Sequence, residues 1–404
     1  MKNIVTIITI LLGICFTYAQ DGFDETQPGF NNQGNMKMYD DSKIGFHMQM
    51  KNDGALDNEN INTGERFNSF AGFYHETDYL VVDGINRPVF GDVDVAVDNN
   101  LYLFNSLGIT NNFLFLTGKV VTNKDDKDVS LDYINYNWHD GEDDDMHVDG
   151  YVTNIGNDEF RFPIGDDDRL REMILPAQSG NQFYEGAYYY IDPEDASTDY
   201  ANTFQGDFLR EEKYYRIEVV SPYEFWDFNG TNGTTITLTW DVNSGINFIT
   251  EELSKLVVVG WNIERERWEN LGRTNITGDF DAGEITSESF TPDDYEIITF
   301  GAFGVERTNY HISPDGDDYN ETLVFNELTD FNESELIIFN RWGNVVYRAT
   351  NYQNDFSGIS NVKAAIAKST KLPVGTYFYQ LKFGNDGILG DSKKGWVYIN
   401  RKAK

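Results

Sequence analysis

Short segments in which apolar and polar residues alternate run through almost the whole chain, and this pattern constrains its fold most. Examples are residues 44–50, 93–97, 235–240 and 377–383, which Asn, Gly and Asp clusters separate from their neighbours. A period of two places one face of a strand in a core and the other in solvent. Only residues 361–371 offer a plausible helical stretch, and we interpret them as an inserted loop. We therefore predict an all-β, multidomain protein built of β-sandwich domains, with a β-solenoid as an alternative for its N-terminal part.

The first twenty residues have the pattern of a secretory signal peptide. Lys2 precedes an apolar run of about 13 residues, and the small residues Thr17 and Ala19 precede a predicted cleavage site at residue 20 or 21. A membrane anchor is the weaker alternative, because a helix needs roughly 20 apolar residues to span a bilayer. No later segment is apolar enough, so no transmembrane insertion of the mature chain is expected. Cys15, the one cysteine, leaves with the signal peptide, which excludes disulfides and thiol chemistry.

Charge is distributed unevenly along the chain. Residues 21–304 hold 55 acidic and 18 basic side chains, whereas residues 305–404 hold 12 of each. The net charge of −37 on the first stretch argues against nucleic acid and against anionic membranes as partners, because both require basic patches. The change in charge predicts a domain boundary near residue 305.

Two regions are predicted before this boundary. In residues 21–155, apolar pairs recur at intervals near the length of one solenoid rung, but no clean repeat is visible, so a short parallel β-solenoid and a sandwich both stay open. Residues 156–304 contain the strand-like segments 213–218, 256–261 and 297–301, and we predict one Greek-key sandwich there.

Residues 305–404 predict a small C-terminal sandwich of the immunoglobulin type. Gly343 and Asn344 form a turn dipeptide that joins two strands as a hairpin. Pro373 and Gly375 mark a rigid beginning of the next strand, where no ladder hydrogen bond is yet required. The alternating segments of this region are residues 335–339, 345–347, 377–383 and 396–399.

Four blocks, residues 311–321, 336–347, 372–379 and 394–401, follow one another in this region. Their order resembles the C-terminal sorting domain of type IX secretion cargo, specifically the type B or gliding motility-associated C-terminal family. The resemblance covers about a quarter of the chain. It implies a folded export address, the type IX translocon and an SprF-like outer-membrane protein as partners, and secretion through the periplasm to the surface of a didermal bacterium. The residues that match its motifs are Arg341, Trp342, Gly343, Asn344, Pro373, Gly375, Lys394, Gly395 and Trp396.

The chain departs from the family pattern in two places. Its mid-domain loop reads Asn354-Asp-Phe-Ser-Gly358, where the family usually has Asp-x-Trp-Asp-Gly, so a role for that acidic side chain does not carry over. Residues 363–371 lengthen the following loop. Neither change disturbs the strand pattern.

One acidic turn predicts a calcium site. Asp315, Asp317, the backbone of Tyr319 and Glu321 fall at alternating positions, and Gly316 permits a tight turn around them. Carboxylate and carbonyl oxygens are the ligands that Ca²⁺ prefers. The alternative is a polar turn at the start of the domain, without an ion.

The remaining clusters predict no catalytic site. Residues 139–147 combine two histidines with carboxylates but lack a fixed metal-ligand spacing, so we interpret them as a solvated hairpin loop. Residues 165–168 are interpreted as a charged corner rather than a calcium turn. The five histidines lie in no recognisable Ser/His/Asp or zinc motif.

The expected function is therefore that of a secreted, non-enzymatic structural or adhesion protein at the cell surface. Two alternatives stay open, an extracellular carbohydrate-binding module and a secreted glycan hydrolase. Residues 188–190 and Trp226 could stack on a sugar ligand, but in a chain rich in Tyr and Phe such side chains more often pack the faces of β-sheets.

Overall fold

The computed structural model describes residues 22, 27–38, 42–58, 69–304, 308–317, 319–329, 331–362, 371–385 and 388–401. The predicted signal peptide and most of the predicted helical stretch lie outside these ranges. Within them strands dominate and no helix exceeds four residues, so the prediction of an all-β, multidomain protein is confirmed. Among the described helices, none has the length and apolar character needed to cross a membrane.

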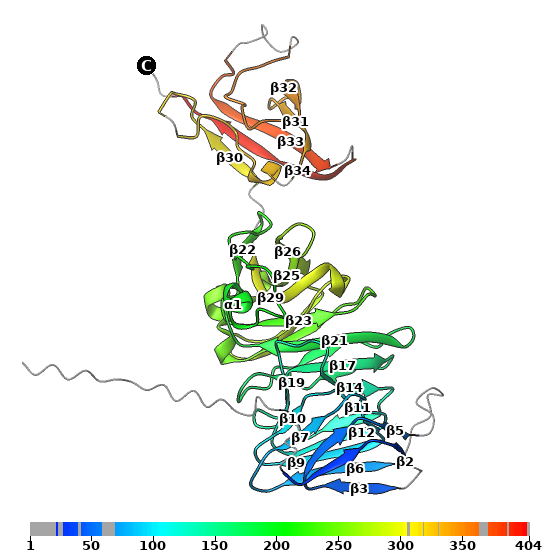
Figure 1. Ribbon diagram of the computed structural model, residues 1–404. Coiled ribbons are helices and arrows are strands. Elements are labelled where there is room, and N and C mark those ends of the chain that lie inside the picture. The colour runs from blue at the N-terminus through cyan, green and yellow to red at the C-terminus, as the bar shows by residue number, and fades with distance from the viewer. Residues whose placement is uncertain are drawn as a thin grey trace, which may run out of the picture.

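The N-terminal part is a parallel β-solenoid, drawn from blue to green in Figure 1. Its first sheet contains β1 (Gly29–Asn32), β4 (Gln49–Asn52), β7 (Leu80–Asp83), β10 (Leu101–Leu103), β13 (Val120–Thr122), β16 (Val148–Asp149) and β19 (Ile164–Gly165). The second contains β3 (Lys43–Phe46), β6 (Phe70–His75), β9 (Asp92–Val97), β12 (Asn112–Thr117) and β15 (Trp138–Asp140). The third side contains β8 (Val89–Phe90), β11 (Leu107–Ile109), β14 (Ser130–Ile134) and β17 (Tyr151–Gly156), and β2 (Asn35–Met38) pairs with β5 (Ala55–Asn58).

Equivalent residues of successive turns lie next to one another in this solenoid. Leu101 pairs in parallel with Leu80 of the preceding turn and with Val120 of the following one, and all three are buried. Parallel strands need a long connection between partners, and here the other two sides of the solenoid supply it. The apolar pairs that recur in the sequence thus lie on successive sides of one solenoid turn. Of the two folds predicted for residues 21–155, the structure shows the solenoid.

Strand β17 joins the solenoid to a sandwich without a break. It pairs in parallel with β14 and antiparallel with β21 (Gln182–Tyr189). The sheet continues through β23 (Phe225–Asn229), β29 (Tyr295–Phe303), β25 (Leu256–Asn262) and β26 (Arg267–Gly272), with β22 (Ile217–Val220) also paired to β29. The opposing sheet contains β18 (Phe160–Phe162), β20 (Met173–Leu175), β24 (Thr237–Trp240), β28 (Gly283–Thr286) and β27 (Asn275–Gly278). One hydrophobic core holds Val82, Val152 and Phe300, so the regions divided at 155/156 in the sequence share a sheet and a core.

The large sheet is covered on its other face as well. Tyr189 and Phe225 pack there against Phe204, which lies in the segment after β21. Tyr188 and Trp226 are fully buried on the opposite face. Tyr188, Tyr189 and Trp226 therefore pack β faces, as the sequence favoured. Tyr190 is 39% exposed, and the guanidinium carbon of Arg169 lies 3.5 Å from the centroid of its ring. The short helices of this part are η1 (Pro193–Asp195), α1 (Ala196–Asp199), η2 (Val242–Ser244), α2 (Ile246–Ile249), η3 (Leu253–Lys255) and η4 (Pro292–Asp294).

The C-terminal module has one five-stranded sheet and a core of its own (Figure 1). Among the described residues no second sheet packs on it, so the predicted immunoglobulin-type sandwich is not formed; loops on either side of η5 (Asn326–Thr329) and after β32 cover the sheet instead, and Leu323, Phe325, Tyr352 and Phe356 are buried there. No residue of the rest of the chain belongs to this core among the described residues. The strand order is β30 (Asn309–Ile312), β34 (Ile388–Ile399), β33 (Gly375–Asn385), β31 (Glu333–Phe339) and β32 (Val345–Thr350).

Candidate functional site

Residues 340–344 form a tight loop between β31 and β32. The side-chain oxygen of Asn340 accepts hydrogen bonds from the backbone N–H groups of Trp342 and Asn344, both at 3.0 Å. Gly343 has φ of +80°, a left-handed conformation that glycine adopts without steric cost. The predicted turn dipeptide, Gly343 and Asn344, is thus the second half of this loop. Asn340, which was not recognised from the sequence, fixes its shape.

This loop presents a cation and an aromatic ring to solvent. Trp342 is 71% exposed, and the guanidinium carbon of Arg341 lies 4.3 Å from the centroid of the indole ring. The attraction between a cation and the face of an aromatic ring favours one joint orientation of the two side chains. Exposed tryptophan adds little to the stability of the module, but it is a side chain typical of contact points with partners.

A row of aromatic side chains crosses the outer face of the same sheet. Phe378 of β33 lies directly opposite Phe339 of β31 and Trp396 of β34. Phe378 is 49% exposed and Trp396 is 39% exposed, whereas Tyr377 and Val397, which point the other way, are buried in the core. Neighbouring rings on one sheet face support one another through cross-strand contacts. An outward row that is apolar rather than polar marks an interaction surface.

The two adjacent lysines of β34 have opposite environments. Lys394 is exposed on the outer face, in line with Trp396. Lys393 is 3% exposed, and its ammonium group donates hydrogen bonds to Glu327 at 2.6 Å and to Tyr310 at 2.9 Å. Burial lowers the pKa of Lys393, but the bonds to Glu327 and Tyr310 outweigh it and raise the pKa on balance. Lys393 therefore ties the sheet to the loop layer, which no sequence motif had indicated.

Gly395, Gly375 and Pro373 have structural roles beside this face. A Cβ atom on Gly395 would lie 1.7 Å from the carbonyl oxygen of Thr308, so only glycine lets that segment approach β34. Gly375 has φ of +151°, and the carbonyl oxygen of Pro373 accepts a hydrogen bond from Tyr377 at 3.0 Å. These residues set the path of the backbone rather than offer side chains for contact.

Six of the nine residues that match the motifs, 341–344, Lys394 and Trp396, lie at one end or on the outer face of this sheet, and Pro373, Gly375 and Gly395 shape the backbone beside them. Phe339 ends β31 opposite Phe378, so the loop that follows it extends toward the beginning of β33. Burial raises the pKa of Tyr377, while the positive charges of Arg401 and Arg341 act against this, which places Arg341 near that end. We call residues 340–344 together with the outward side chains Phe339, Phe378, Lys394 and Trp396 the motif face. Phe339 and Phe378 were missed in the sequence, because in a segment with adjacent aromatic residues alternation does not show which ones point outward.

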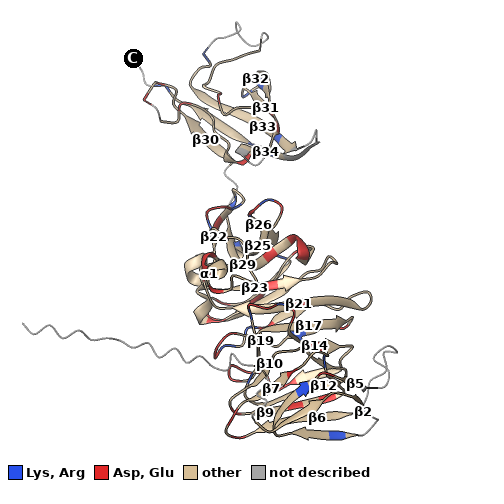
Figure 2. Ribbon diagram, in the orientation of Figure 1, with Lys and Arg blue, Asp and Glu red and all other residues tan. Residues whose placement is uncertain are grey.

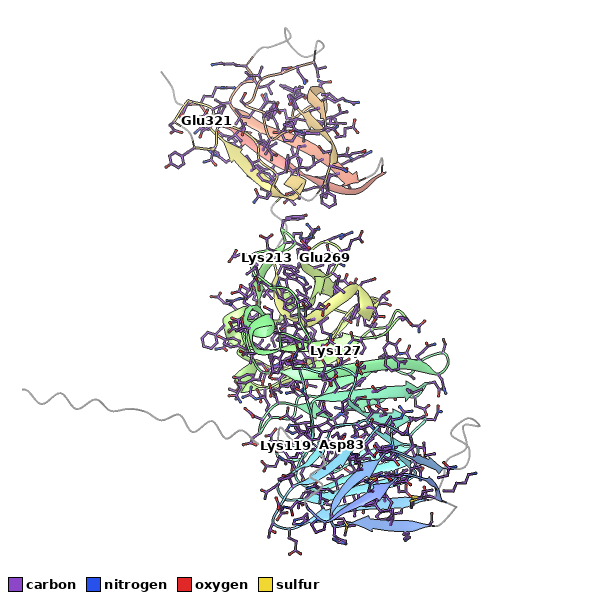
Figure 3. The ribbon with its side chains drawn as sticks, in the orientation of Figure 1. Asp83, Lys119, Lys127, Lys213, Glu269 and Glu321 are labelled. Atoms are coloured by element: carbon purple, nitrogen blue, oxygen red, sulfur yellow. The ribbon has the colours of Figure 1, made fainter. Side chains whose placement is uncertain are left out.

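The acidic turn brings its predicted ligands together. Carboxylate oxygens of Asp315, Asp317 and Glu321 lie within 4.8 Å of one another, and Glu321 is labelled in Figure 3. One oxygen of Glu321 already accepts hydrogen bonds from the N–H groups of residues 315, 316 and 317, at 3.3, 2.7 and 3.1 Å. The carbonyl oxygen of Tyr319 lies 3.4 Å from the hydroxyl of Ser313, which donates to it. The arrangement fits Ca²⁺ and also a polar turn that the N–H groups stabilise without an ion, so calcium remains a prediction.

In the other clusters, side chains are paired with lysines or contact backbone carbonyl groups of the protein itself. Lys124 is buried with its ammonium nitrogen 2.6 Å from Asp149 and 2.7 Å from Asp166, and that of Lys119 lies 2.7 Å from Asp168, so two aspartates of the predicted charged corner are paired with lysines. His139 contacts the carbonyl oxygen of Arg161 at 2.8 Å. His147, at the other end of the predicted loop, is buried and lies 3.1 Å from the carbonyl oxygen of residue 143. Figure 2 shows acidic residues over many turns of the solenoid and the sandwich rather than in one patch.

The C-terminal module is an export signal domain. Residues 305–399 match the family model described as CHU_C Type IX secretion signal domain, which confirms the resemblance found in the motifs. No curated protein and no solved structure matches the chain. The match shows that the chain carries a type IX sorting signal, which implies contact with the secretion machinery and secretion to the cell surface or the extracellular space.

Proposed function

We propose that this protein is a structural or adhesive component of the cell surface, and that the motif face is the surface by which the type IX machinery recognises it. The observation that carries the proposal is the grouping of six motif residues, 341–344, Lys394 and Trp396, on the motif face of a module with its own core. An address that is read in the folded state needs such an independent, exposed surface. We further propose that the translocon and an SprF-like outer-membrane protein contact this face.

The architecture of residues 22–304 supports a non-catalytic role. Solenoid and sandwich form one body with a continuous sheet and core. Most of the large aromatic side chains that are fully buried lie in this stretch, and its surface carries mainly negative charge, which suits a solvated position outside the cell. These features favour a scaffold or an adhesin over a hydrolase.

Export of a reporter fused to residues 305–404 tests the proposal. We expect the reporter outside the cell, and we expect Trp342→Ala to reduce export more than tenfold, because the loss of an exposed aromatic contact point typically costs about 2 kcal/mol of binding. The matched control is Tyr319→Ala, since Tyr319 is 75% exposed on the acidic turn of the same module. Equal export of both variants would contradict the assigned role of the motif face. A wild-type fusion that stays in the periplasm would contradict the sorting role itself.

A further inference from the structure

A polar cavity lies where the solenoid passes into the sandwich. Its volume is about 250 Å³, and it opens at the ends of three adjacent strands, β14, β17 and β21. The amide nitrogen of Asn181 donates a hydrogen bond to the side-chain oxygen of Asn135 at 2.6 Å across this opening. The side chains that line the cavity are Asn135, Tyr136, Asn154, Asn157, Asp158 and Asn181.

Asn154 is the most buried of the polar side chains that line the cavity, with an exposed fraction of only 2%. A side-chain amide offers two hydrogen-bond donors and an acceptor. A small polar ligand in this cavity could pair with the amide of Asn154.

The lining selects the class of that ligand. It contains four asparagines, one aspartate and one tyrosine but no Lys, Arg or His, so it does not favour an anion. Amides both donate and accept, as the hydroxyl groups of a sugar do. Tyr136 stacks on His139 with ring centroids 5.7 Å apart and adds an apolar surface of fixed orientation, against which the C–H face of a sugar ring can pack. Drug-sized pockets begin at roughly 300 Å³, so this cavity suits a single small ring.

We propose that this cavity binds one neutral sugar unit of a surface or extracellular glycan. The inference rests on the proposed adhesive function and gives that function a ligand class and a site. It is independent of the C-terminal signal domain, because every lining residue lies between residues 135 and 181, in the part of the chain before that domain, which we call the passenger.

Gly156 offers a way to narrow the cavity without replacing any of its polar side chains. A Cβ atom on this residue would lie 3.4 Å from the side-chain oxygen of Asn154, a contact that is tolerated sterically but covers the amide. Gly180 lies just before Asn181, and a Cβ there meets no atom within 4 Å. Gly156→Ala and Gly180→Ala therefore form a matched pair: the first adds a methyl group against Asn154 in the cavity, and the second adds a methyl group that meets no atom.

The experiment titrates the full-length mature protein with D-glucose, D-galactose, D-mannose and N-acetyl-D-glucosamine, followed by saturation-transfer NMR and calorimetry. We expect at least one of these sugars to bind with a Kd on the order of 1 mM, as a ligand of this size allows. Gly156→Ala and Asn154→Leu should weaken binding more than tenfold, whereas Gly180→Ala should not change it. Melting temperatures verify that the variants fold. If Asn154→Leu does not fold, Gly156→Ala still tests the site.

Three results would overturn the inference: no binding of any of the four sugars, binding that persists in both cavity variants, or a response to Ca²⁺ alone. Export of the same variants is measured in parallel. Variants that reach the cell surface but fail to bind sugar separate a failure of this site from a failure of the sorting role.

Discussion

The side chain of Glu185 lies in surroundings that disfavour its charged form. It lies on β21 beside Asp227 of the neighbouring strand β23, and its oxygen accepts a hydrogen bond from Thr153 at 3.2 Å. Burial, and then the negative charge of Asp227, raise the pKa of Glu185 to about 7. Lys127, labelled in Figure 3, acts in the opposite direction but is already paired with Asp227 at 2.8 Å.

The raised pKa has a defined effect on stability. Because the folded state holds the proton more tightly than the unfolded state, the stability of the fold decreases as pH rises from about 4.5 to about 7 and stays lower above that range. The shift corresponds to roughly 3 kcal/mol at most, and partial exposure of the side chain reduces the expected effect to about 1–2 kcal/mol. Glu185→Gln removes the charge with little change in shape. It should therefore raise the melting temperature at pH 8 by about 2–4 °C and have little effect at pH 5.

Fluorescence of the buried tryptophans Trp226 and Trp268 follows this transition in thermal melts at both pH values. The control is Glu218→Gln, an exposed glutamate on β22, which should not change the melting temperature at either pH. A variant of Glu185 that melts at or below the wild-type temperature at pH 8 would refute the reasoning. An equal rise at pH 5 and pH 8 would also refute it, because the gain would then not come from the charge.

Two further predictions concern the C-terminal module. Lys393→Met should lower the stability of residues 305–404 by about 3–5 kcal/mol, because it leaves Glu327 buried without its cation, whereas Lys394→Met, on the adjacent exposed lysine, should stay within about 1 kcal/mol in denaturant unfolding of the module. Equal losses for the two lysines would show that the buried pair does not hold the loop layer. If the acidic turn binds calcium, a chelator should lower the melting temperature of the module, and Asp317→Asn should abolish that difference; an unchanged midpoint with chelator would leave the turn as a polar turn stabilised by its own N–H groups.

The sequence was sufficient for the fold class and for the C-terminal module, because both depend on local patterns. Alternation marked the strands, and Gly343, Gly375 and Gly395 each occupy a position where backbone geometry or close contact requires glycine. The local sequence pattern could not decide between solenoid and sandwich. It shows which residues form strands, but not which strands pair, and the parallel pairing of Leu80 with Leu101 is therefore visible only in the structure.

The same limit applies to the sites. Strand β17 pairs in parallel on one side and antiparallel on the other, so the solenoid ends and the sandwich begins within one continuous sheet. The sequence predicts a domain boundary at 155/156 because it does not show that the sheet continues across this point. The exposure of Phe378 and the burial of Asn154 depend on neighbours far away in the sequence. Motif residues could therefore be recognised individually, but neither the surface on which they lie nor the cavity around Asn154 could be predicted.

The unbroken ladder of hydrogen bonds through β17 leaves the passenger no hinge between its two halves. Force applied to one end is transmitted to the other through backbone hydrogen bonds and a shared hydrophobic core rather than through a flexible linker. The solenoid and the sandwich therefore keep a fixed spacing and angle to one another, because they share a sheet and a core.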